Sequence, residues 1–261
     1  PDAQQRLGVV AKGLELANLI LGPGVNRAVQ PLRVATDQGA IVMSHAQGLG
    51  MRQAFLAADP AARQELIRRA AEWLAALTVD RSEIPFTAWG RTQRLAGWVA
   101  ESDFGSWGDR QLATRATARM GALARILHGR PVLAAFSHGD FHSENLFVHR
   151  ADGQIVMTGI DFELRNPIPI VRDLSKMLTW LEVDDDHGTS ALAGLTPQNL
   201  EPIYPVWRDL PKTDRQALHF HVGGWLLQLY LTRGERNAKI RPDVERSLRV
   251  WCGTEDLAAV L

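Results

Sequence analysis

The spacing of apolar residues changes several times along the chain. Apolar residues recur every three or four positions over residues 2–21, 60–77 and 109–127, as in amphipathic helices. Over residues 28–46 and 131–161 they form short continuous or alternating runs, which are typical of strands. Beyond about residue 170 the helical period returns. The pattern therefore predicts a helix-rich chain that contains two short β regions.

Turn-forming and capping residues mark the ends of the elements in the first half. Gly22-Pro23-Gly24 should end the first helix, and "DQG" should join the strands "AVQPLRVAT" and "GAIVMSHA". Pro60 suits the first turn of the second helix, and Asp109 suits the N-cap of a third. Residues 78–108 have mixed periodicity, so we expect a short helix between loops there without fixing its ends.

The second half begins with strands and ends with helices. "PVLAAFSH", "NLFVH" and "QIVMTGID" are the expected strands, with "RADG" as the turn between the last two. Three helices should follow, in "RDLSKMLTWL", "TDRQALHFHVGGWLLQLYLTRG" and "RPDVERSLRVW". In the second of them, Thr213 and Gln216 have the spacing of a capping box.

Composition and charge narrow the choice of partners. The 29 basic and 29 acidic side chains cancel, so no basic field indicates a nucleic acid or an anionic membrane as partner. Apolar runs are too short for a bilayer span and no signal peptide is evident, so we expect a cytoplasmic protein. Cys252 is the only cysteine, which excludes an intrachain disulfide. The oligomeric state stays open.

Polar residues with the chemistry of a catalytic site gather in "HGDFHSENLFVHRADGQIVMTGIDFE", residues 138–163. Asp140 follows a predicted strand, Asn145 lies five residues later, and Asp161 ends the returning strand, so we expect the three to converge at one end of a small sheet. The side-chain oxygens of aspartate and asparagine are ligands that suit Mg²⁺. Phosphoryl transfer uses one carboxylate on the attacking hydroxyl and others on the metal.

"HGDFHSENLF" followed by "TGIDFE" resembles the paired motifs of the aminoglycoside phosphotransferase and choline kinase family, which has the protein-kinase-like fold. "IVMSHAQG" is similar to that family's adenine-binding strand and hinge, and "RDLSKML" to the helix after its metal motif. The resemblance implies an α+β fold, Mg²⁺ and ATP or GTP as cofactors, and a small-molecule acceptor with a hydroxyl group. The reaction would be transfer of the γ-phosphoryl group.

The same resemblance implies a role for each matching residue. Asp140 would be the catalytic base and His138 would brace its loop. Asn145 and Asp161 would bind magnesium, with Glu163 and Asp173 as supporting carboxylates around the site. The backbone of Ser44 and Ala46 would face the adenine.

One part of the family pattern is missing. A kinase-like fold begins with a glycine-rich strand pair and a lysine that pairs with a helix glutamate, and Glu15 could be that glutamate, yet no such strands precede it. Lys12 lies in the helix and does not replace the lysine. We therefore expect a fragment of a longer protein, with residues 1–47 as the remnant of the N-terminal lobe and residues 48–261 as the helical C-terminal lobe.

Two other functions stay open. A binding module without turnover, like a pseudokinase, would account for the missing strands. A metallohydrolase would use His138, Asp140 and His142 on one strand face as metal ligands.

Several residues have a structural as well as a functional interpretation. The acidic run 182–188 could face a cationic acceptor or form a solvated loop. Tryptophans could stack on a substrate but are more often buried, and His142 could contact substrate or merely line the loop. His219 and His221, two residues apart on a helix, should serve packing rather than zinc binding.

Overall fold

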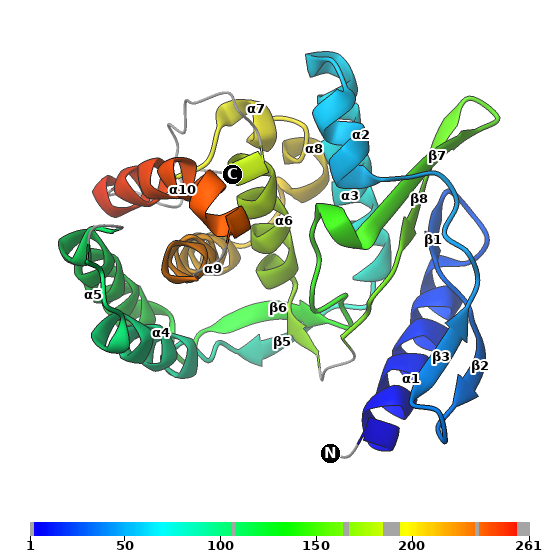
Figure 1. Cartoon of the computed structure of the whole chain (residues 1–261), viewed down its shortest axis with the longest axis horizontal. Helices are drawn as coiled ribbons and strands as arrows, with labels where there is room; N and C mark the ends of the chain where they lie inside the picture. The colour runs from blue at the N-terminus through cyan, green and yellow to red at the C-terminus, as the bar shows by residue number, and fades with distance from the viewer. Residues whose placement is uncertain (1–2, 106–107, 164–166, 185–193, 233–234, 255–261) are drawn as a thin grey trace. The chain divides into compact units, whose positions relative to one another are not determined.

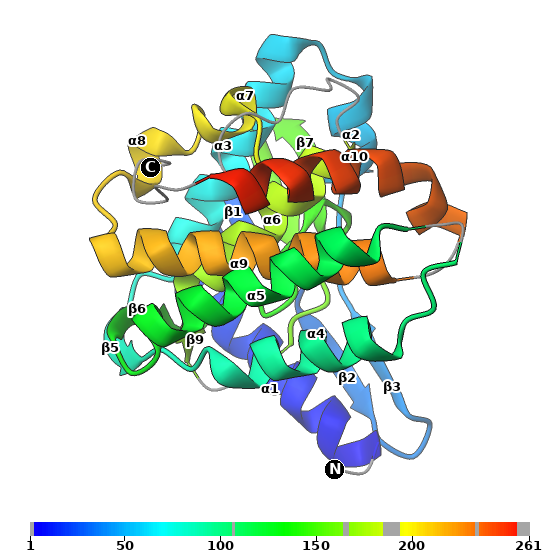
Figure 2. The same cartoon turned by 90° about the vertical axis from the view of Figure 1, so that its left-hand side faces the viewer.

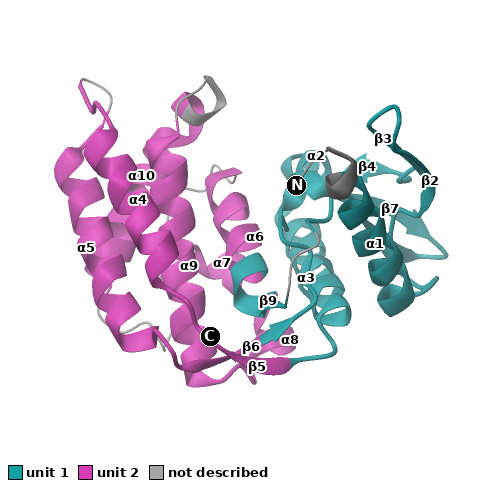
Figure 3. Cartoon of the chain, turned by 90° about the horizontal axis from the view of Figure 1, so that it is seen from below, with its two compact units in different colours: residues 1–81, 134–173 teal, residues 82–133, 174–261 magenta. Residues whose placement is uncertain are grey.

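The computed structural model describes residues 3–105, 108–163, 167–184, 194–232 and 235–254. The chain divides into two compact units, residues 1–81 with 134–173 (unit 1) and residues 82–133 with 174–261 (unit 2), which are coloured separately in Figure 3. A lobe boundary at residue 47 remains a prediction. None of the helices in the described ranges is long and apolar enough to cross a membrane.

Unit 1 is built on a four-stranded sheet of order β1-β8-β7-β4 (Figure 1). Its hairpin pairs β7 with β8 antiparallel, from Leu146 opposite Gly159 to Ala151 opposite Gln154. Asp152 and Gly153 form the turn with φ angles of 51° and 75°, as a two-residue hairpin loop requires, so the predicted turn is confirmed. The elements of the sheet are β1 (Asn26–Ala28), β4 (Leu49–Gly50), β7 (Leu146–Ala151) and β8 (Gln154–Gly159).

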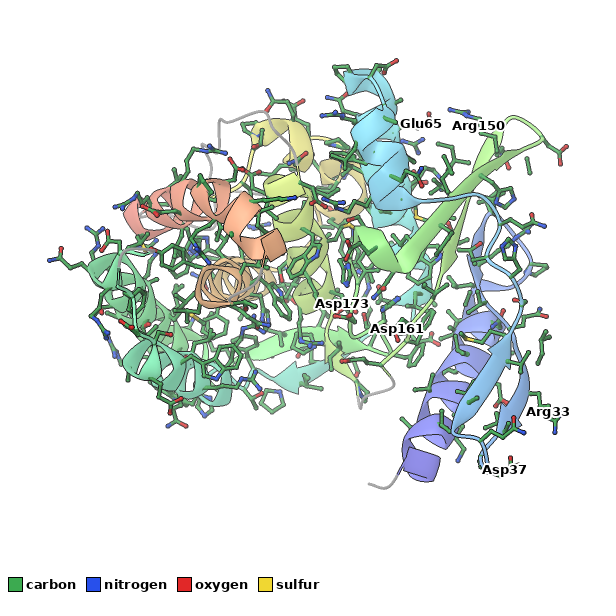
Figure 4. All side chains as sticks on the ribbon, in the orientation of Figure 1. Arg33, Asp37, Glu65, Arg150, Asp161 and Asp173 are labelled. Atoms are coloured by element: carbon green, nitrogen blue, oxygen red, sulfur yellow. The ribbon has the colours of Figure 1, made fainter. Side chains whose placement is uncertain are left out.

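The remaining elements of unit 1 surround this sheet. β2 pairs with β3 as the antiparallel hairpin that "DQG" predicted, and β6 pairs with β9. Helix α3 is linked to β7 at one edge by the Glu65–Arg150 ion pair, 3.1 Å from oxygen to nitrogen (Figure 4). The elements are α1 (Ala3–Leu21), β2 (Pro31–Ala35), β3 (Ala40–Met43), α2 (Met51–Ala57), α3 (Pro60–Leu77), the 3₁₀ helix η1 (Ser143–Asn145) and β9 (Ile168–Pro169).

Trp73 of α3 organises the core of unit 1. Its ring is fully buried, and its Nε1 donates a hydrogen bond of 2.9 Å to the carbonyl oxygen of Arg27 in β1. A Cβ atom on Gly159 would lie 2.5 Å from the ring, so only glycine lets β8 come this close. The ring also stacks on Phe141, with centroids 5.4 Å apart. One side chain therefore fixes two strands and the loop after β6.

Unit 2 is mostly helical. Helices α5, α9 and α10 lie side by side, and α4 packs against α5 and α9 (Figure 2). Its elements are β5 (Ser82–Pro85), α4 (Trp89–Glu101), α5 (Arg110–Leu127), α7 (Pro197–Leu200), α8 (Tyr204–Trp207), α9 (Lys212–Leu231) and α10 (Glu235–Gly253). Strand β6 (Pro131–Ala135) begins in unit 2 and ends in unit 1. Helix α6 (Ile170–Asp184) begins in unit 1 and ends in unit 2.

Sequence signals located some helix ends and missed others. Asp59 and Asp109 cap α3 and α5 by accepting bonds from Ala62 and Leu112, as expected of Asp at an N-cap. The capping box at Thr213 is wrong, because α9 already begins at Lys212 and its N-cap, Pro211, makes no side-chain cap. The sequence pattern also missed α2.

Two further details differ from expectation. Helix α10 begins before Pro242 and includes it, although we expected a start near that residue. Strand β6 pairs with β9 and is not part of the β7–β8 sheet, so the three expected strands do not form one sheet.

Glu182, the first residue of the acidic run, is buried in unit 2. Its carboxylate accepts bonds from the backbone nitrogen and hydroxyl of Thr196, at 2.7 and 2.9 Å, and from Asn199 at 3.4 Å. Burial raises the pKa of Glu182, and the hydrogen bonds from Thr196 oppose that rise. Glu182 therefore belongs neither to an acidic wall nor to a solvated loop; residues 185–188 lie outside the described residues.

We expect Trp73→Ala to lower the free energy of unfolding by about 3–5 kcal/mol, the usual cost of truncating a buried tryptophan. The control is Trp98→Ala in α4, where the side chain is 39% exposed; its cost should stay below about 1 kcal/mol. Urea unfolding measures both. Equal costs would contradict the central position of Trp73.

Glu182 should make stability depend on pH in a defined direction. A carboxyl group with a raised pKa in the folded state stabilises the fold most at and below its unfolded pKa, near 4.5, and this contribution falls as pH rises through the folded value. The stability advantage of the wild type over Glu182→Gln should therefore be larger at pH 4.5 than at pH 7.5. If the stability advantage of the wild type grew with pH instead, the pKa of Glu182 would be lowered in the folded state.

Candidate active site

The loop that carries Asp140 is held by the buried carboxylate of Asp173, in the first turn of α6. One oxygen, Oδ2, accepts bonds from the hydroxyl of Ser137 at 2.6 Å and from the backbone nitrogen of Gly139 at 2.7 Å. Burial raises the pKa of Asp173, while the charge of Arg172 and these bonds oppose the rise. The predicted supporting carboxylate thus contacts the residues just before Asp140.

Arg172 holds the same loop through the other polar group of the Gly139 backbone, the carbonyl. Its guanidinium donates a 3.0 Å bond to the carbonyl oxygen of Gly139 and lies 3.8 Å from Oδ1 of Asp173. Both polar groups of the Gly139 backbone are therefore bound by consecutive residues of α6.

Gly139 also allows the two motifs to touch. Its φ angle of 86° is in the left-handed region, and a Cβ atom would lie 2.7 Å from the carbonyl oxygen of Glu163. The backbone nitrogen of Glu163 donates a 2.9 Å bond to the oxygen of His138, and that of Ile160 a 3.0 Å bond to Asn145. The "HGDFHSEN" and "GIDFE" segments are thus joined side by side.

Asp140, His142 and Asn145 form one hydrogen-bonded group. Asn145 donates through Nδ2 to the backbone oxygen of Asp140 at 2.9 Å and to its Oδ2 at 3.2 Å. His142 Nε2 lies 3.3 Å from the same Oδ2, and its Nδ1 accepts from the nitrogen of Glu144 at 3.4 Å. Nδ2 of Asn145 also lies 3.3 Å from Nε2 of His142, so the three side chains are all within hydrogen-bonding distance of one another. The Asp140 side chain keeps 26% exposure, so its carboxylate is accessible from solvent.

Asp161 has a strained backbone beside a well-packed neighbour. Its φ angle is 58°, which costs about 1 kcal/mol or more in a residue other than glycine. Phe162 is buried and stacks on the ring of His138, with centroids 4.5 Å apart and a 24° angle between the planes. Burial of Phe162 offsets the strain, and the Asp161 carboxylate is left exposed (Figure 4).

The residues present fit a magnesium ion. Asn145 uses its Nδ2 to donate to Asp140, so its Oδ1 can face a cation, and the carboxylate of Asp161 makes no bond to other described residues. Both atoms are the hard oxygen ligands that Mg²⁺ prefers, and the remaining positions of its shell commonly hold water and phosphate oxygens.

The metallohydrolase alternative finds less support. Across the described ranges, no group of three or more His, Cys, Asp or Glu side chains could hold a metal ion. His138 packs against Phe162, and its Nδ1 lies 3.3 Å from the backbone nitrogen of Asp140. These contacts are consistent in geometry with a bracing residue, and the role of His138 stays a prediction.

Ser44 and Ala46 remain predicted nucleotide contacts. Ser44 exchanges two bonds with Gln30: its nitrogen donates to the Gln30 oxygen at 2.9 Å, and its hydroxyl accepts from the Gln30 nitrogen at 2.8 Å. Ser44 lines a polar cavity of about 350 Å³ in unit 1, together with Asn18, Gln30, His45, Gln47 and Thr158. The lining of that cavity does not include Asp140, Asn145 or Asp161.

His219 and His221 pack in the core of unit 2, as predicted. His219 stacks on Trp251 with centroids 5.0 Å apart, and His221 meets Phe86 edge-on at 5.4 Å. Burial, followed by the charge of Arg119, lowers the pKa of His219 well below its usual value.

Sequence reasoning missed Trp73 and Arg172 as supports of the site. Trp73 is more than 60 residues from the loop that it contacts, and nothing in its own helix distinguishes it from other buried tryptophans. Arg172 had one usable signal, its place directly before Asp173, because consecutive residues in the first turn of a helix can reach the same loop.

Known proteins resemble this chain in sequence family and in fold. The model of the phosphotransferase enzyme family matches residues 16–210. A glucosamine kinase (crystal form B) has a TM-score of 0.59 and 18% identity, over 95% of this chain and 68% of that one. A Plasmodium vivax ethanolamine kinase has a TM-score of 0.55 and 12% identity, over 91% and 71%. No curated protein sequence matches.

A third structure, "Glucosamine kinase in complex with glucosamine, ADP and inorganic phosphate", has a TM-score of 0.55 and 18% identity, over 94% of this chain and 66% of that one. This chain thus spans about two thirds of the length of these kinases. At identities this low, the TM-scores show a common fold and no more than that. Since the family model covers most of the sequence, the chain belongs to the phosphotransferase enzyme family and has the α+β, protein-kinase-like fold that its motifs predicted.

Proposed function

We propose that this chain is the catalytic part of a small-molecule kinase that transfers the γ-phosphoryl group of ATP, or of GTP, to an acceptor hydroxyl. The observation that carries the proposal is the pair of backbone hydrogen bonds that joins the Asp140 and Asp161 segments. These bonds hold the segments of Asp140, Asn145 and Asp161 side by side in unit 1, which supports the proposed roles of these residues as base and cation ligands.

In this proposal each residue has a separate task. Asp140 accepts the proton of the attacking hydroxyl, and the bonds from His142 and Asn145 fix the orientation of its carboxylate. Asn145 and Asp161 would hold Mg²⁺, which supplies positive charge to the phosphate oxygens when bound. His138, Glu163 and Asp173 position these groups, while Ser44 and Ala46 would face the adenine.

The acceptor class follows from the family and from fold neighbours. The similar structures are named as kinases of glucosamine and ethanolamine, both of which carry hydroxyl groups. We therefore propose a hydroxyl-bearing small molecule as acceptor. A cytoplasmic location, as expected from the sequence, is part of this proposal.

Two isosteric changes separate the base from the metal ligand. Asp140→Asn should lower kcat by about 10²-fold or more and leave nucleotide affinity nearly unchanged, because only the proton acceptor is lost. Asp161→Asn keeps the left-handed backbone accessible but should weaken magnesium-dependent nucleotide binding itself.

The assay is acceptor-dependent ATP consumption by the full-length protein, tested with aminoglycosides, choline, amino alcohols and sugars. Asp152→Asn, in the β7–β8 turn, is the matched control and should behave as wild type. Full turnover by Asp140→Asn would overturn the assignment of the base. Absence of both turnover and nucleotide binding in the wild type would favour the binding module.

Asp173 should affect both stability and turnover. Asp173→Ala removes the acceptor of the Ser137 and Gly139 bonds, so we expect a loss of about 3 kcal/mol in unfolding free energy and a large fall in kcat. Ser137→Ala removes one donor only and should cost about 1 kcal/mol with turnover mostly retained. Chemical unfolding and steady-state kinetics test both variants, and equal effects of the two would contradict the role of the Asp173 carboxylate in holding the loop.

A further inference from the structure

Unit 1 contains a polar cavity of about 350 Å³ whose lining includes neither the proposed base nor the proposed metal ligands. It is bounded by the end of α1, by the strands β1, β7 and β8, and by the segment after β3 (Figure 1). Its polar lining includes Arg27, Gln30, Ser44, Gln47, His149 and Thr158, and we call it the Arg27–Thr158 cavity. Ligand pockets usually measure about 300–1,000 Å³, so this cavity has the size for a small molecule.

The pairing of the strands places three of the lining side chains on one face of the sheet. Arg27 of β1 pairs with Thr158 of β8, and Thr158 pairs with Phe147 of β7. Paired residues of neighbouring strands lie on the same face, and so do residues two apart in one strand, which adds His149. The guanidinium, the hydroxyl and the imidazole are therefore neighbours at the wall of the cavity.

The charge of Arg27 has no counter-ion in the described part of unit 1. Its Nε donates a 2.7 Å bond to the carbonyl oxygen of Gly24, and its two Nη atoms make no hydrogen bond or ion pair with other described residues. Among the described residues that line the cavity there is no aspartate or glutamate. Arg27 is half-buried, so its guanidinium is reached through the cavity. A guanidinium in such a place favours an anion.

Two polar groups of the same wall lack partners inside the protein. Thr158 is only 7% exposed, yet its hydroxyl makes no hydrogen bond to other described residues. Nδ1 of His149 is buried and has no hydrogen-bond partner in the described part of the chain. Buried polar groups are normally paired, because an unpaired one loses its hydration without replacement. A polar molecule in the cavity would supply the missing partners.

The opposite walls are held by bonds that leave further polar groups available. Nδ2 of Asn18 donates to the carbonyl oxygens of Leu14 and Val29, at 2.8 and 2.9 Å, so its Oδ1 remains as an acceptor. The hydroxyl of Ser44 accepts from the nitrogen of Gln30 at 2.8 Å and keeps its own proton to donate. The cavity is thus preorganised, with both donors and acceptors in its lining.

We propose that the Arg27–Thr158 cavity binds a small hydroxylated molecule that carries an oxyanion, either a phosphate or a carboxylate group. Arg27 would bind the oxyanion through charge-assisted hydrogen bonds, with the hydroxyl of Thr158 as a further donor. Oδ1 of Asn18 would accept from hydroxyl groups of the molecule, as would carbonyl groups of the last turn of α1. Arg27 and Thr158 have no task in the proposed phosphoryl transfer, so this inference does not depend on that function.

The test is calorimetric titration of the full-length protein with three probes, glucose 6-phosphate, gluconate and glucose. The buffer is free of nucleotide and magnesium, at pH 7 and constant ionic strength. We expect one of the two anionic probes to bind at least about tenfold more tightly than glucose, because glucose lacks the oxyanion. The anionic probe that binds more tightly identifies phosphate or carboxylate as the recognised group.

Two variants test the cavity, and circular dichroism confirms that each is folded. Arg27→Met should weaken binding of that probe about tenfold, and Thr158→Val, which replaces the hydroxyl by a methyl group, about fivefold. Thr158→Val should not lower the free energy of unfolding in urea, because the hydroxyl has no protein partner to lose; a structural hydroxyl would behave otherwise. Arg33→Met, at an exposed arginine of β2 (Figure 4), is the matched control and should bind the probe as wild type.

Asp140→Asn separates the cavity from the acceptor site of the proposed kinase, and it too should bind the probe as wild type. Weaker binding by Asp140→Asn, with unchanged binding by Arg27→Met and Thr158→Val, would place the probe at the catalytic loop and overturn the proposal. Glucose binding as tightly as both anionic probes, or no binding of either anionic probe to the wild type, would overturn it as well.

Discussion

The geometry of the candidate site depends on the close approach of the backbones at Gly139 and Glu163. A side chain at residue 139 would collide with the carbonyl oxygen of Glu163, and the hydrogen bond from Glu163 to His138 would be lost. Without that bond, only the bond from Ile160 to Asn145 would still tie the segment with Asp161 to the segment with Asp140. The glycine of the "HGD" motif is thus a steric requirement of the site.

Two groups of side chains maintain this approach from different directions. Arg172 and Asp173 bind the carbonyl and amide of Gly139, which fixes the peptide planes around it. Trp73 contacts the rings of His138, Phe141 and Phe162, so the same indole packs against both motifs. Hydrogen bonds set the orientation of the loop, and aromatic packing excludes water from behind it.

Much of this arrangement could be predicted from local sequence. Pro60 in the first turn of α3, the cap at Asp109 and the turn at Asp152 are signals confined to a few residues, and all three proved right. The start of α9 could not be predicted in this way, because the buried Asp214 accepts a bond from the backbone of Leu133, a residue 81 positions away. At this helix end a tertiary contact outweighs the local helix and capping propensity.

In the candidate site, too, features set by local sequence could be predicted and features set by tertiary contacts could not. The motif spacing predicted that Asp140, Asn145 and Asp161 would converge, since strand ends and a hairpin impose it. The hydrogen bonds from His142 and Asn145 to Asp140 depend on side-chain rotamers, which spacing does not determine.

The left-handed backbone of Asp161 bears on how this sequence has been selected. At φ 58°, glycine would be free of the strain that aspartate bears, so mutation with selection for folding alone would favour glycine at residue 161. Glycine at residue 161 would relieve the backbone strain but remove the carboxylate. Stability and the proposed metal binding therefore make opposite demands on this residue.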